Sequence, residues 1–545
     1  MCENKSTRKG IDLSDKKAHA ADHSAWDRRS FLKTIGLAGA STFTLQTLPI
    51  TSMFSATLAN AFNGESGKKL VLIRLKGGND GLNTFVPVYE YDLYKNLRPT
   101  LGHETSDLIN LNNDFSMPTA MSDLLPLWQS DQMRVINSVG YPDHNLSHFT
   151  GADIMASGNS NPSENGDGWL ARYFTGQYPD YIENPCDFPP AIKIGGPTSI
   201  LFNDADKIDI SANFASAEQL NDLAETGVLF NNTDAPDNCY YGEQVLFLRT
   251  IANAASIYSV SISDAYNNSV TEATYPASLG DQLKLVARLI KGGLETQFYL
   301  VTLDGFDTHV SQNGGGDHLG LLENLSSAVR AFYEDLAAGD ADSDVLSMTY
   351  SEFGRRVEEN GFAGTDHGTA LPIMLFGPAL EGAGFHGMDP DLTDLNSDGN
   401  LKFGTDFRSV YATILQEWLC LEATAVDDIL GGQYDRLTDI GISCSTTSTQ
   451  SVAGLTQAGF AHRLATLGAG EFQVILENPK AGKAKIELLT ISGKRVKTIA
   501  DQYVHPGVHY LPFSIAHLNI ELAPMVYSVE MNGVRQVGKF LASSR

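Results

Sequence analysis

Short apolar runs recur along the chain, and each is closed by glycine or by turn-forming residues. The runs are continuous and rich in valine, isoleucine, leucine, tyrosine and phenylalanine. Runs of this kind are typical of strands that are buried on both faces. Five of them stand out, at 69–78, 133–140, 296–305, 345–354 and 371–377. We therefore expect these five runs to form strands of one buried sheet.

Helical patterns lie between these runs. In residues 318–339 apolar side chains recur at helical spacing and Gly339 supplies a stop signal, and residues 405–419 repeat the pattern. Strands that alternate with helices predict an α/β domain with a largely parallel sheet flanked by helices. Residues 155–285 are rich in Asn, Asp, Gly and Pro, and we expect long excursions and some helices that cover the sheet.

The composition changes near residue 450, where a stretch rich in serine and threonine begins. This stretch predicts a linker over 451–470, which ends the α/β domain assigned to 62–450. In the last segment, 471–545, alternating strand patterns are separated by glycine turns. We expect this segment to form a small antiparallel β-sandwich.

The first 61 residues have the pattern of an export signal. Twin arginines, Arg28 and Arg29, are followed by Ser-Phe-Leu-Lys, and no charged residue occurs from Thr34 to Gly64. This pattern predicts a twin-arginine signal peptide over 1–61, with a membrane anchor as the alternative. Export by this route implies the twin-arginine translocase as a partner.

Composition narrows the function further. The chain has 545 residues, of which 42% are apolar, and a formal net charge of -27. This acidity argues against a nucleic acid partner, because phosphate backbones are bound by clustered lysine and arginine. Four cysteines lie beyond the signal segment, at Cys186, Cys239, Cys420 and Cys444. Three disulfide pairings stay open, and a buried free thiol at Cys420 is an equal alternative.

Polar side chains accompany every predicted strand at the edge where ligands gather in open α/β sheets. They are Asp80 after the first run; Asp143, His144, Ser147, His148 and Thr150 after the second; Asp304, Asp307 and His309 after the third; Glu352 at the end of the fourth; and Asp366 and His367 directly before the fifth. Carboxylates and imidazoles that converge at one edge repel one another or are poorly solvated unless a cation binds between them. These groups are ligands of zinc, manganese and related ions.

We therefore predict a metal site of one or two divalent ions, either zinc, manganese or calcium. The predicted ligands are Asp80, Asp307, His309, Glu352, Asp366 and His367. Each also has a structural interpretation: Asp80 lies in a glycine-rich turn, Glu352 is close to two arginines, and the others are compatible with loop polarity. Their repeated placement beside strands favours the metal site.

Several motifs in one order resemble a known family. They are LKGGNDGLNTFVPVYEYDLYKNLRPTL, SHFTGADIMASG, GFDTH, SEFGRR and GTDHG followed by DFRSVYATIL, over roughly residues 68–435. They resemble the domain-of-unknown-function 1501 family, which is similar to the alkaline phosphatase and sulfatase superfamily of α/β metalloenzymes. The resemblance implies an alkaline phosphatase-like core. Function within the family is largely unassigned, so the hydrolysis of phosphate or sulfate esters is implied by fold analogy alone.

The resemblance also implies roles for single residues. Asp80 resembles the first metal carboxylate of the superfamily, and Asp307 and His309 resemble an Asp and a His that bind one metal ahead of a long helix. The superfamily usually places Asp-His after the next strand. This chain has Glu352 followed by phenylalanine, so the histidine is missing there. His367 resembles a later metal histidine, and the aspartate before it is a further candidate ligand.

The superfamily also needs a nucleophile at a helix start after the second strand, where the helix dipole and a metal lower the pKa of a hydroxyl. Ser147 is the catalytic candidate, and Thr150 lies close by. Ser147 has a structural alternative as a helix N-cap. These differences from the superfamily pattern are compatible with an altered activity and with a loss of activity.

The last segment contains ENPKAGKAKIELLTISGKRVKTI, PGVHYLPF, LAPMVYSVEMNG and VGKFL. These motifs resemble the type A sorting domain of the type 9 secretion system. The resemblance implies the type 9 secretion machinery as a partner in a Bacteroidota-like bacterium. The protein is then expected in the periplasm in transit, and afterwards secreted or on the cell surface.

The sequence thus predicts an exported metal-dependent hydrolase of phosphate or sulfate esters, with a small-molecule or glycan ester as substrate. The alternative is a noncatalytic cell-surface binding protein that keeps the alkaline phosphatase-like fold.

Overall fold

The structure is a computed structural model that divides into two units, Met1–Cys444 and Ser445–Arg545. It describes residues 67–159, 166–178, 188–195, 199–205, 207–214, 258–382, 384–444, 461–468, 471–478, 480–490, 495–505, 507–515, 523–531 and 534–542. The predicted signal peptide, Cys186 and Cys239 lie outside these residues. Among the described helices, none is long and apolar enough to span a bilayer.

The first unit is built on a sheet of nine described strands, in the order β13-β5-β12-β9-β1-β8-β6-β7, with β14 also paired to β5. The strands are β1 (Lys69–Lys76), β5 (Met133–Gly140), β6 (Ala191–Ile194), β7 (Ser211–Phe214), β8 (Phe298–Asp304), β9 (Val345–Tyr350), β12 (Leu371–Phe376), β13 (Gly384–Gly387) and β14 (Thr405–Asp406). All five predicted strands are confirmed, and they are neighbours in the sheet. The strands β6 and β7 were not predicted, and they extend the sheet from the segment expected to cover it.

The sheet is parallel at every junction except the two that β12 makes. β1 is parallel to β8 and β9, whereas β12 is antiparallel to β9 and β5. The start of β12 therefore lies at the same edge as the carboxyl ends of β5, β9, β1 and β8. This reversal explains why polar residues that precede the fifth predicted strand share an edge with residues that follow the others.

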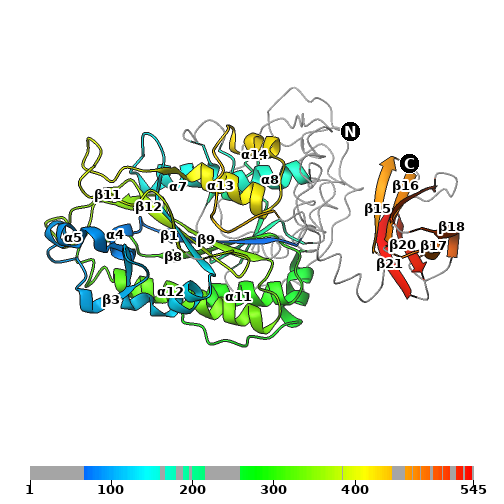
Figure 1. Ribbon diagram of the computed structural model, residues 1–545, viewed down its shortest axis with the longest axis horizontal. Helices are drawn as coiled ribbons and strands as arrows, with labels where there is room; N and C mark the ends of the chain where they lie inside the picture. Colours follow the sequence, from blue (N-terminus) through cyan, green and yellow to red (C-terminus); the bar gives the residue numbers. More distant parts are fainter. Residues whose placement is uncertain are drawn as a thin grey trace, which may run out of the picture. The chain divides into compact units, whose positions relative to one another are not determined.

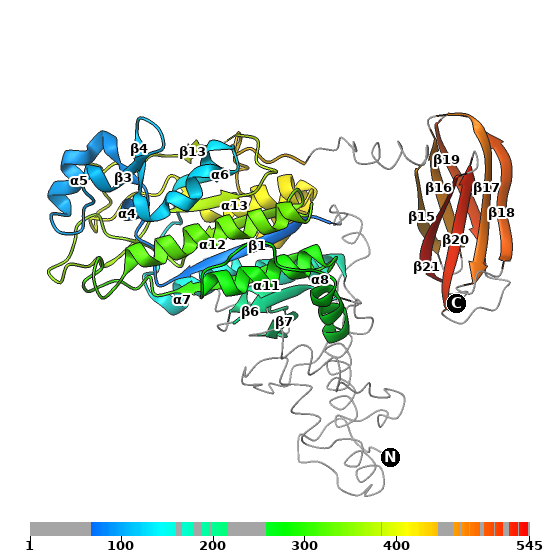
Figure 2. The ribbon, with the colours of Figure 1, turned by 90° about the horizontal axis from the view of Figure 1, so that it is seen from below.

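Helices cover both faces of the sheet, as Figures 1 and 2 show. One face carries α6 (Leu125–Gln129), α11 (Leu279–Lys291) and α12 (His318–Ala338). The other carries α7 (His148–Ser157), α8 (Trp169–Gln177), α13 (Phe407–Thr413) with the π-helical turn η7 (Ile414–Trp418), and α14 (Ala423–Leu430). The two helices predicted from periodicity correspond to α12 and to α13 with η7. The flanked, largely parallel α/β architecture is thus confirmed.

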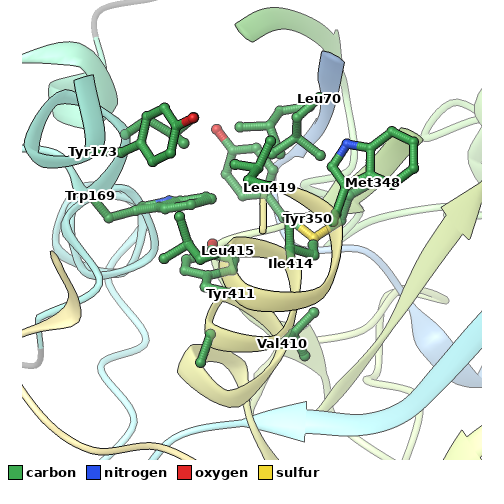
Figure 3. Close-up of a cluster of buried hydrophobic side chains, with 14 of the residues drawn as sticks. Leu70, Trp169, Tyr173, Met348, Tyr350, Val410, Tyr411, Ile414, Leu415 and Leu419 are labelled. Atoms are coloured by element: carbon green, nitrogen blue, oxygen red, sulfur yellow. The ribbon is translucent and has the colours of Figure 1, made fainter. Parts of the chain in front are cut away.

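Alternate side chains of the central strand β1 enter the two cores. Val71 and Ile73 pack with α11 and α12, whereas Leu70 and Leu72 pack on the opposite face. Figure 3 shows this second core, in which Trp169 of α8 reaches Tyr411 of α13. Their rings stack with centroids 4.5 Å apart. This contact fixes α8 against α13 on that face of the sheet.

Short elements complete the first unit. They are α4 (Gly81–Thr84), α5 (Tyr91–Leu97), the sheet β2-β4-β3 (Val86–Pro87, Phe115–Pro118, Leu108–Asn110), the 3-10 turns η2 (Val88–Glu90), η3 (Thr105–Asp107), η4 (Thr119–Leu124) and η5 (Ile200–Phe202), and the pair β10 (Gly354–Arg355) with β11 (His367–Gly368).

A disulfide joins Cys420 to Cys444. The alternative of a free thiol at Cys420 is therefore wrong in this structure.

The second unit contains two antiparallel sheets, β15-β16-β19 and β18-β17-β20-β21. Its strands are β15 (Ala461–Gly468), β16 (Glu471–Asn478), β17 (Gly482–Thr490), β18 (Arg495–Val504), β19 (Gly507–Ser514), β20 (Ala523–Met531) and β21 (Val534–Ala542). Side chains of both sheets, such as Val474 and Ile486, share one core, so the predicted β-sandwich is confirmed. β15 lies within the stretch predicted as linker. The prediction failed there because that strand is recognisable by its pairing with β16 rather than by its composition.

Candidate metal centre

Three segments bring metal-binding side chains to one edge of the sheet. His148 is the first residue of α7, which follows β5, and Asp307 and His309 lie in the loop between β8 and α12. His367 lies on β11, opposite Arg355 on the antiparallel partner β10. The site is therefore assembled from loops at the carboxyl edge, where open α/β sheets place their ligands.

Four side chains converge there, and we refer to His148, Asp307, His309 and His367 as the metal group. His148 Nε2 lies 3.3 Å from Asp307 Oδ2, and His367 Nε2 lies 3.5 Å from Asp307 Oδ1. One ligand atom from each of these three residues falls within 4.8 Å of the others. His309 joins them, because its Nε2 is 3.2 Å from Asp307 Oδ1 and 2.8 Å from His367 Nε2.

Hydrogen bonds at the far side of each imidazole fix its tautomer. The Nδ1 atoms of His148, His309 and His367 face Glu352 Oε1 at 3.0 Å, Asp366 Oδ1 at 3.0 Å and the Leu146 carbonyl at 2.8 Å. A carboxylate and a carbonyl only accept, so each Nδ1 carries the proton that it donates. In the neutral rings every Nε2 then presents a lone pair to the centre. This is the arrangement that orients histidine ligands on metals.

The residues present fit a divalent ion. A tetrahedral ion with bonds of about 2.0–2.1 Å sets its ligand atoms about 3.3 Å apart. Four of the separations within the metal group run from 2.8 to 3.5 Å, and the ligand atoms of His148, Asp307 and His367 all lie within 4.8 Å of one another. Two neutral Nε2 lone pairs at the shortest of these separations repel one another unless a cation or a shared proton lies between them. Zinc and related ions take such nitrogen and oxygen donors.

Arg355 holds Asp307 in place. Its guanidinium is buried and donates to Asp307 Oδ1 at 2.8 Å, to the Phe306 carbonyl at 3.0 Å and to the Thr365 carbonyl at 2.8 Å. The same group binds the carbonyls of Gly77 and Gly78, which follow β1. One side chain thus ties together the ends of the segments that carry the ligands.

Two glycines allow this close packing. Gly77 has φ of +123°, and a Cβ there would lie 2.3 Å from the backbone nitrogen of Asp307. Gly78 has φ of +89°, and a Cβ there would lie 2.6 Å from the ring of Phe353, which packs on His148 and His367. Both positions therefore exclude any larger residue, and the glycines of the first motif are required by the geometry of the site.

Electrostatics keep the ligand atoms in their binding forms. Partial burial raises the pKa of Asp307, but the hydrogen bond and charge of Arg355, with His148 and His309, outweigh it, so the pKa lies below its usual value. Burial lowers the pKa of His367, and the Leu146 hydrogen bond only partly opposes this. At neutral pH the site therefore presents an ionised carboxylate and a neutral imidazole, the forms that bind metals.

Glu352 and Asp366 were predicted as ligands, and the structure places both behind the histidines instead. Glu352 is buried, and its Oε1 also accepts from the Gly77 amide at 2.9 Å. Its Oε2 lies 3.7 Å from Arg74. Asp366 is exposed and accepts a second hydrogen bond, from Asn360 at 3.0 Å. In this geometry the two carboxylates orient imidazoles.

Asp80 was also predicted as a ligand, and the structure does not bring it into the metal group. Arg98 donates to both of its oxygens, at 2.9 and 2.7 Å, and Gln312 donates to Oδ2 at 2.6 Å, all in the buried interior. Burial raises the pKa of Asp80, but the charge of Arg98 and these hydrogen bonds bring it below its usual value. An arginine thus binds the carboxylate that was expected to bind a metal ion. The described residues build one metal group.

A family model, described as a protein of unknown function (DUF1501), matches residues 128–430, which is more than half of the chain. The chain belongs to the DUF1501 family. The matched segment contains the whole metal group as well as Glu352 and Asp366, whereas Asp80 lies before it. A search of curated proteins gave no match.

Solved structures of the alkaline phosphatase superfamily are similar to this DUF1501 chain over most of its length. A superfamily protein from Vibrio parahaemolyticus is 12% identical, with 89% of this chain and 88% of that chain covered and a TM-score of 0.28. A phosphonate monoester hydrolase from Silicibacter pomeroyi is 9% identical, with 82% and 89% covered and a TM-score of 0.31. Alkaline phosphatase from the Antarctic bacterium TAB5 is 10% identical, with 59% and 95% covered and a TM-score of 0.22. These scores are too low to transfer a role to any residue.

Ser147, the predicted nucleophile, occupies the N-cap position of α7 in the DUF1501 domain, directly before His148. It is exposed, and its hydroxyl makes no capping hydrogen bond. The structural alternative of a side-chain cap is therefore not realised. The catalytic role of Ser147 stays a prediction.

His148 was noted among the polar residues after the second strand but was not predicted as a ligand. The motif SHFTG was interpreted through its serine and threonine hydroxyls. The signal that identifies His148 is its place at the first turn of a helix after a buried strand, which directs its ring to the same edge as Asp307.

Weakening a hydrogen bond behind a ligand is expected to weaken metal binding. Asp366→Ala removes the acceptor at His309 Nδ1 and is expected to lower zinc affinity by about 10- to 100-fold. Asp366→Asn keeps an acceptor and is expected to have a smaller effect. Competition with a chromogenic chelator measures both affinities, with the exposed loop variant Asp391→Asn as control. Equal affinities in all three variants would show that Asp366 does not support the site.

A buried histidine beside the site makes stability depend on pH. Burial lowers the pKa of His318 to about 4, its Nε2 is 3.1 Å from Asn79 Oδ1, and its Nδ1 has no partner. Because the unfolded histidine binds its proton near pH 6.5, the unfolded chain holds more protons between pH 6.5 and 4. The free energy of unfolding is therefore expected to fall as pH drops through this window, by on the order of 3 kcal/mol from His318.

Denaturant titrations with chelator present at pH 7, 6, 5 and 4 measure this dependence. His318→Gln keeps a donor toward Asn79 but does not titrate. The slope of its unfolding free energy against pH is therefore expected to be smaller than that of the wild type, by the amount that one bound proton contributes. An unchanged slope in the variant contradicts the assignment.

Proposed function

We propose that this DUF1501 protein is a metal-dependent hydrolase of phosphate or sulfate esters. The observation that carries the proposal is the convergence of three imidazole Nε2 atoms on Asp307, with an acceptor at each Nδ1. Such outer acceptors prepare histidines as ligands.

The donor set favours zinc or manganese. Three of the four donors are imidazole nitrogens, which suit zinc and neighbouring transition ions, whereas calcium prefers six to eight oxygen donors. Of the three metals that the sequence suggested, calcium therefore fits least well. A divalent ion at this position would supply a Lewis acid that lowers the pKa of water and offsets charge on an ester oxygen.

The charges around the metal group favour an anionic substrate. Three carboxylates in and around the metal group are each matched by an arginine: the buried Asp80 by Arg98, the exposed Asp307 by Arg355 and the buried Glu352 by Arg74. The charge of a bound divalent ion would therefore not be cancelled by these carboxylates. A phosphate or sulfate group would complement the remaining positive charge.

The chain's own groups would then position the reactants. Arg355 would hold the Asp307 carboxylate fixed while charge develops nearby, so little reorganisation is needed. Ser147, exposed and adjacent to His148, is the candidate nucleophile. Its place at a helix N-terminus favours an ionised hydroxyl.

We further propose that the protein is exported. The support is the twin-arginine pattern before residue 62 and the motifs of the last segment, which folds as a β-sandwich. The proposed partners are the twin-arginine translocase and the type 9 secretion machinery, and the proposed destination is the medium or the cell surface.

The test is turnover by the full chain after metal removal and reconstitution. p-Nitrophenyl phosphate, bis(p-nitrophenyl) phosphate and p-nitrophenyl sulfate are offered to protein loaded with zinc, manganese or calcium. We expect release of p-nitrophenol with zinc or manganese, loss in His367→Gln, and retention in His386→Gln, which changes a histidine of β13 outside the metal group. Stoichiometric metal without turnover would favour the noncatalytic binding protein.

A further inference from the structure

Two exposed apolar residues directly follow histidines of the metal group in the sequence, and a third lies in a turn that is hydrogen-bonded to the loop carrying His309. Phe149 is 86% exposed and Phe362 is 72% exposed, more than any other large apolar side chain in the part of the chain that the structure describes. Val310 is 58% exposed. A single exposed apolar residue needs no explanation, but three beside one polar site suggest a ligand. We refer to Phe149, Val310 and Phe362 as the apolar rim.

The apolar rim is tied to the ligands through the backbone. Phe149 follows His148 in the first turn of α7, and Val310 follows His309. The Phe362 carbonyl accepts from the amide of Ser311 at 3.0 Å, which joins its turn to the loop that carries His309.

Asn360 in the same turn reinforces this connection. Its side chain donates to the His309 carbonyl at 2.9 Å and to Asp366 Oδ1 at 3.0 Å. The turn that presents Phe362 is thus attached directly to one ligand and to the carboxylate behind it.

The site and its rim therefore offer two different surfaces to one ligand. The metal group would bind an anion, for the charge reasons given above, and the apolar rim would gain free energy by covering hydrocarbon. A ligand that satisfies both carries a charged head and an apolar tail on the same molecule. A small ester without hydrocarbon leaves the rim exposed to water, because it has no apolar surface with which to cover it.

We propose that the preferred substrates are amphiphilic esters, in which a phosphate or sulfate group is attached to an apolar alcohol. This inference rests on the proposed function, since the metal group is required to hold the anion. The apolar alcohol contacts Phe149, Val310 and Phe362, while the anion faces His148, Asp307, His309 and His367.

The experiment measures binding of methyl, butyl and octyl phosphate, and of the matching sulfates, to the full zinc-loaded chain by calorimetry. Full burial of one methylene strengthens binding about fourfold. With partial burial we expect octyl phosphate or octyl sulfate to bind at least about 30-fold more tightly than its methyl counterpart. The rim variants Phe149→Ser and Phe362→Ser are expected to reduce this ratio to a few-fold. Tyr503→Ser, which removes an exposed aromatic ring from the C-terminal unit, is expected to leave it unchanged.

The outcomes separate the inference from the function on which it rests. Zinc-dependent binding that does not change with chain length overturns the inference and leaves the proposed function standing. No binding of any phosphate or sulfate to the loaded protein overturns both. A third arm offers vesicles of neutral phosphatidylcholine. Binding to them without zinc, lost in the rim variants, assigns the rim to a membrane surface and overturns the inference.

Discussion

Replacing Asp307 with asparagine is expected to lower the affinity for zinc by at least about 100-fold and to abolish metal-dependent hydrolysis. Asp307 is the only carboxylate in the metal group, and its two oxygens lie 3.2 to 3.5 Å from the three histidine nitrogens. The amide loses the anionic oxygen that would bind the cation. It also leaves the buried guanidinium of Arg355 without its counter-ion beside the metal. Affinity is measured by chelator competition.

A matched control distinguishes a local effect from a general change in charge. Asp304, at the end of β8 in the same loop region, is exposed and pairs with Lys76 at 2.5 Å. Asp304→Asn removes the same charge outside the metal group and is expected to keep wild-type affinity. If both variants bind zinc equally well, Asp307 is not a ligand.

Removing the arginine partner of Asp80 is expected to have the largest effect on stability. Arg98→Met leaves an ionised carboxylate buried without its partner, because both side chains are at most 1% exposed. Loss of one member of a buried pair costs about 3–5 kcal/mol of unfolding free energy. Arg98 also donates to Asn83 at 2.8 Å and to the carbonyls of Val357 and Arg356, so the effect is expected at the upper end. Denaturant unfolding in the presence of chelator measures it.

The partner substitution separates the two interpretations of Asp80. In the double variant Asp80→Asn/Arg98→Met the buried charge is gone, so part of the lost stability is expected to return. Asp80→Asn alone is expected to retain zinc affinity, because the Asp80 carboxylate accepts hydrogen bonds from Arg98 and Gln312 and does not belong to the metal group. A loss of zinc in Asp80→Asn would restore the sequence prediction that this residue is a ligand.

The central sheet was predictable because buried strands leave a strong sequence pattern. The runs around Leu72, Ile136 and Ile373 are predominantly apolar, and glycine marks where they end. The strands β6 and β7 were missed because each has only four residues within a polar stretch. Their place in the sheet depends on pairing with β8 and with each other, which no local pattern reveals.

The metal group was only partly predictable from the sequence. Asp307, His309 and His367 were selected because polar residues at strand ends share an edge, and the structure brings them together. The sequence did not distinguish residues that belong to the metal group from residues that hydrogen-bond to its histidines, such as Glu352. That distinction depends on tertiary distances and on which imidazole nitrogen faces inward.

Asp80 shows a different limit. Its position after β1 matched the expectation for a ligand, but Arg98 lies 18 residues further along and reaches it only in the folded state. The pattern of polar residues at strand ends does not record such a partner, because the arginine belongs to the segment after α5.

The most direct test of the account is the metal content of the full chain, purified without chelator, offered zinc and manganese, and analysed by elemental mass spectrometry. The account predicts one equivalent of zinc or manganese per chain, lost in Asp307→Asn and kept in Asp80→Asn. A folded protein that retains no metal would contradict it, as would two equivalents of which one depends on Asp80.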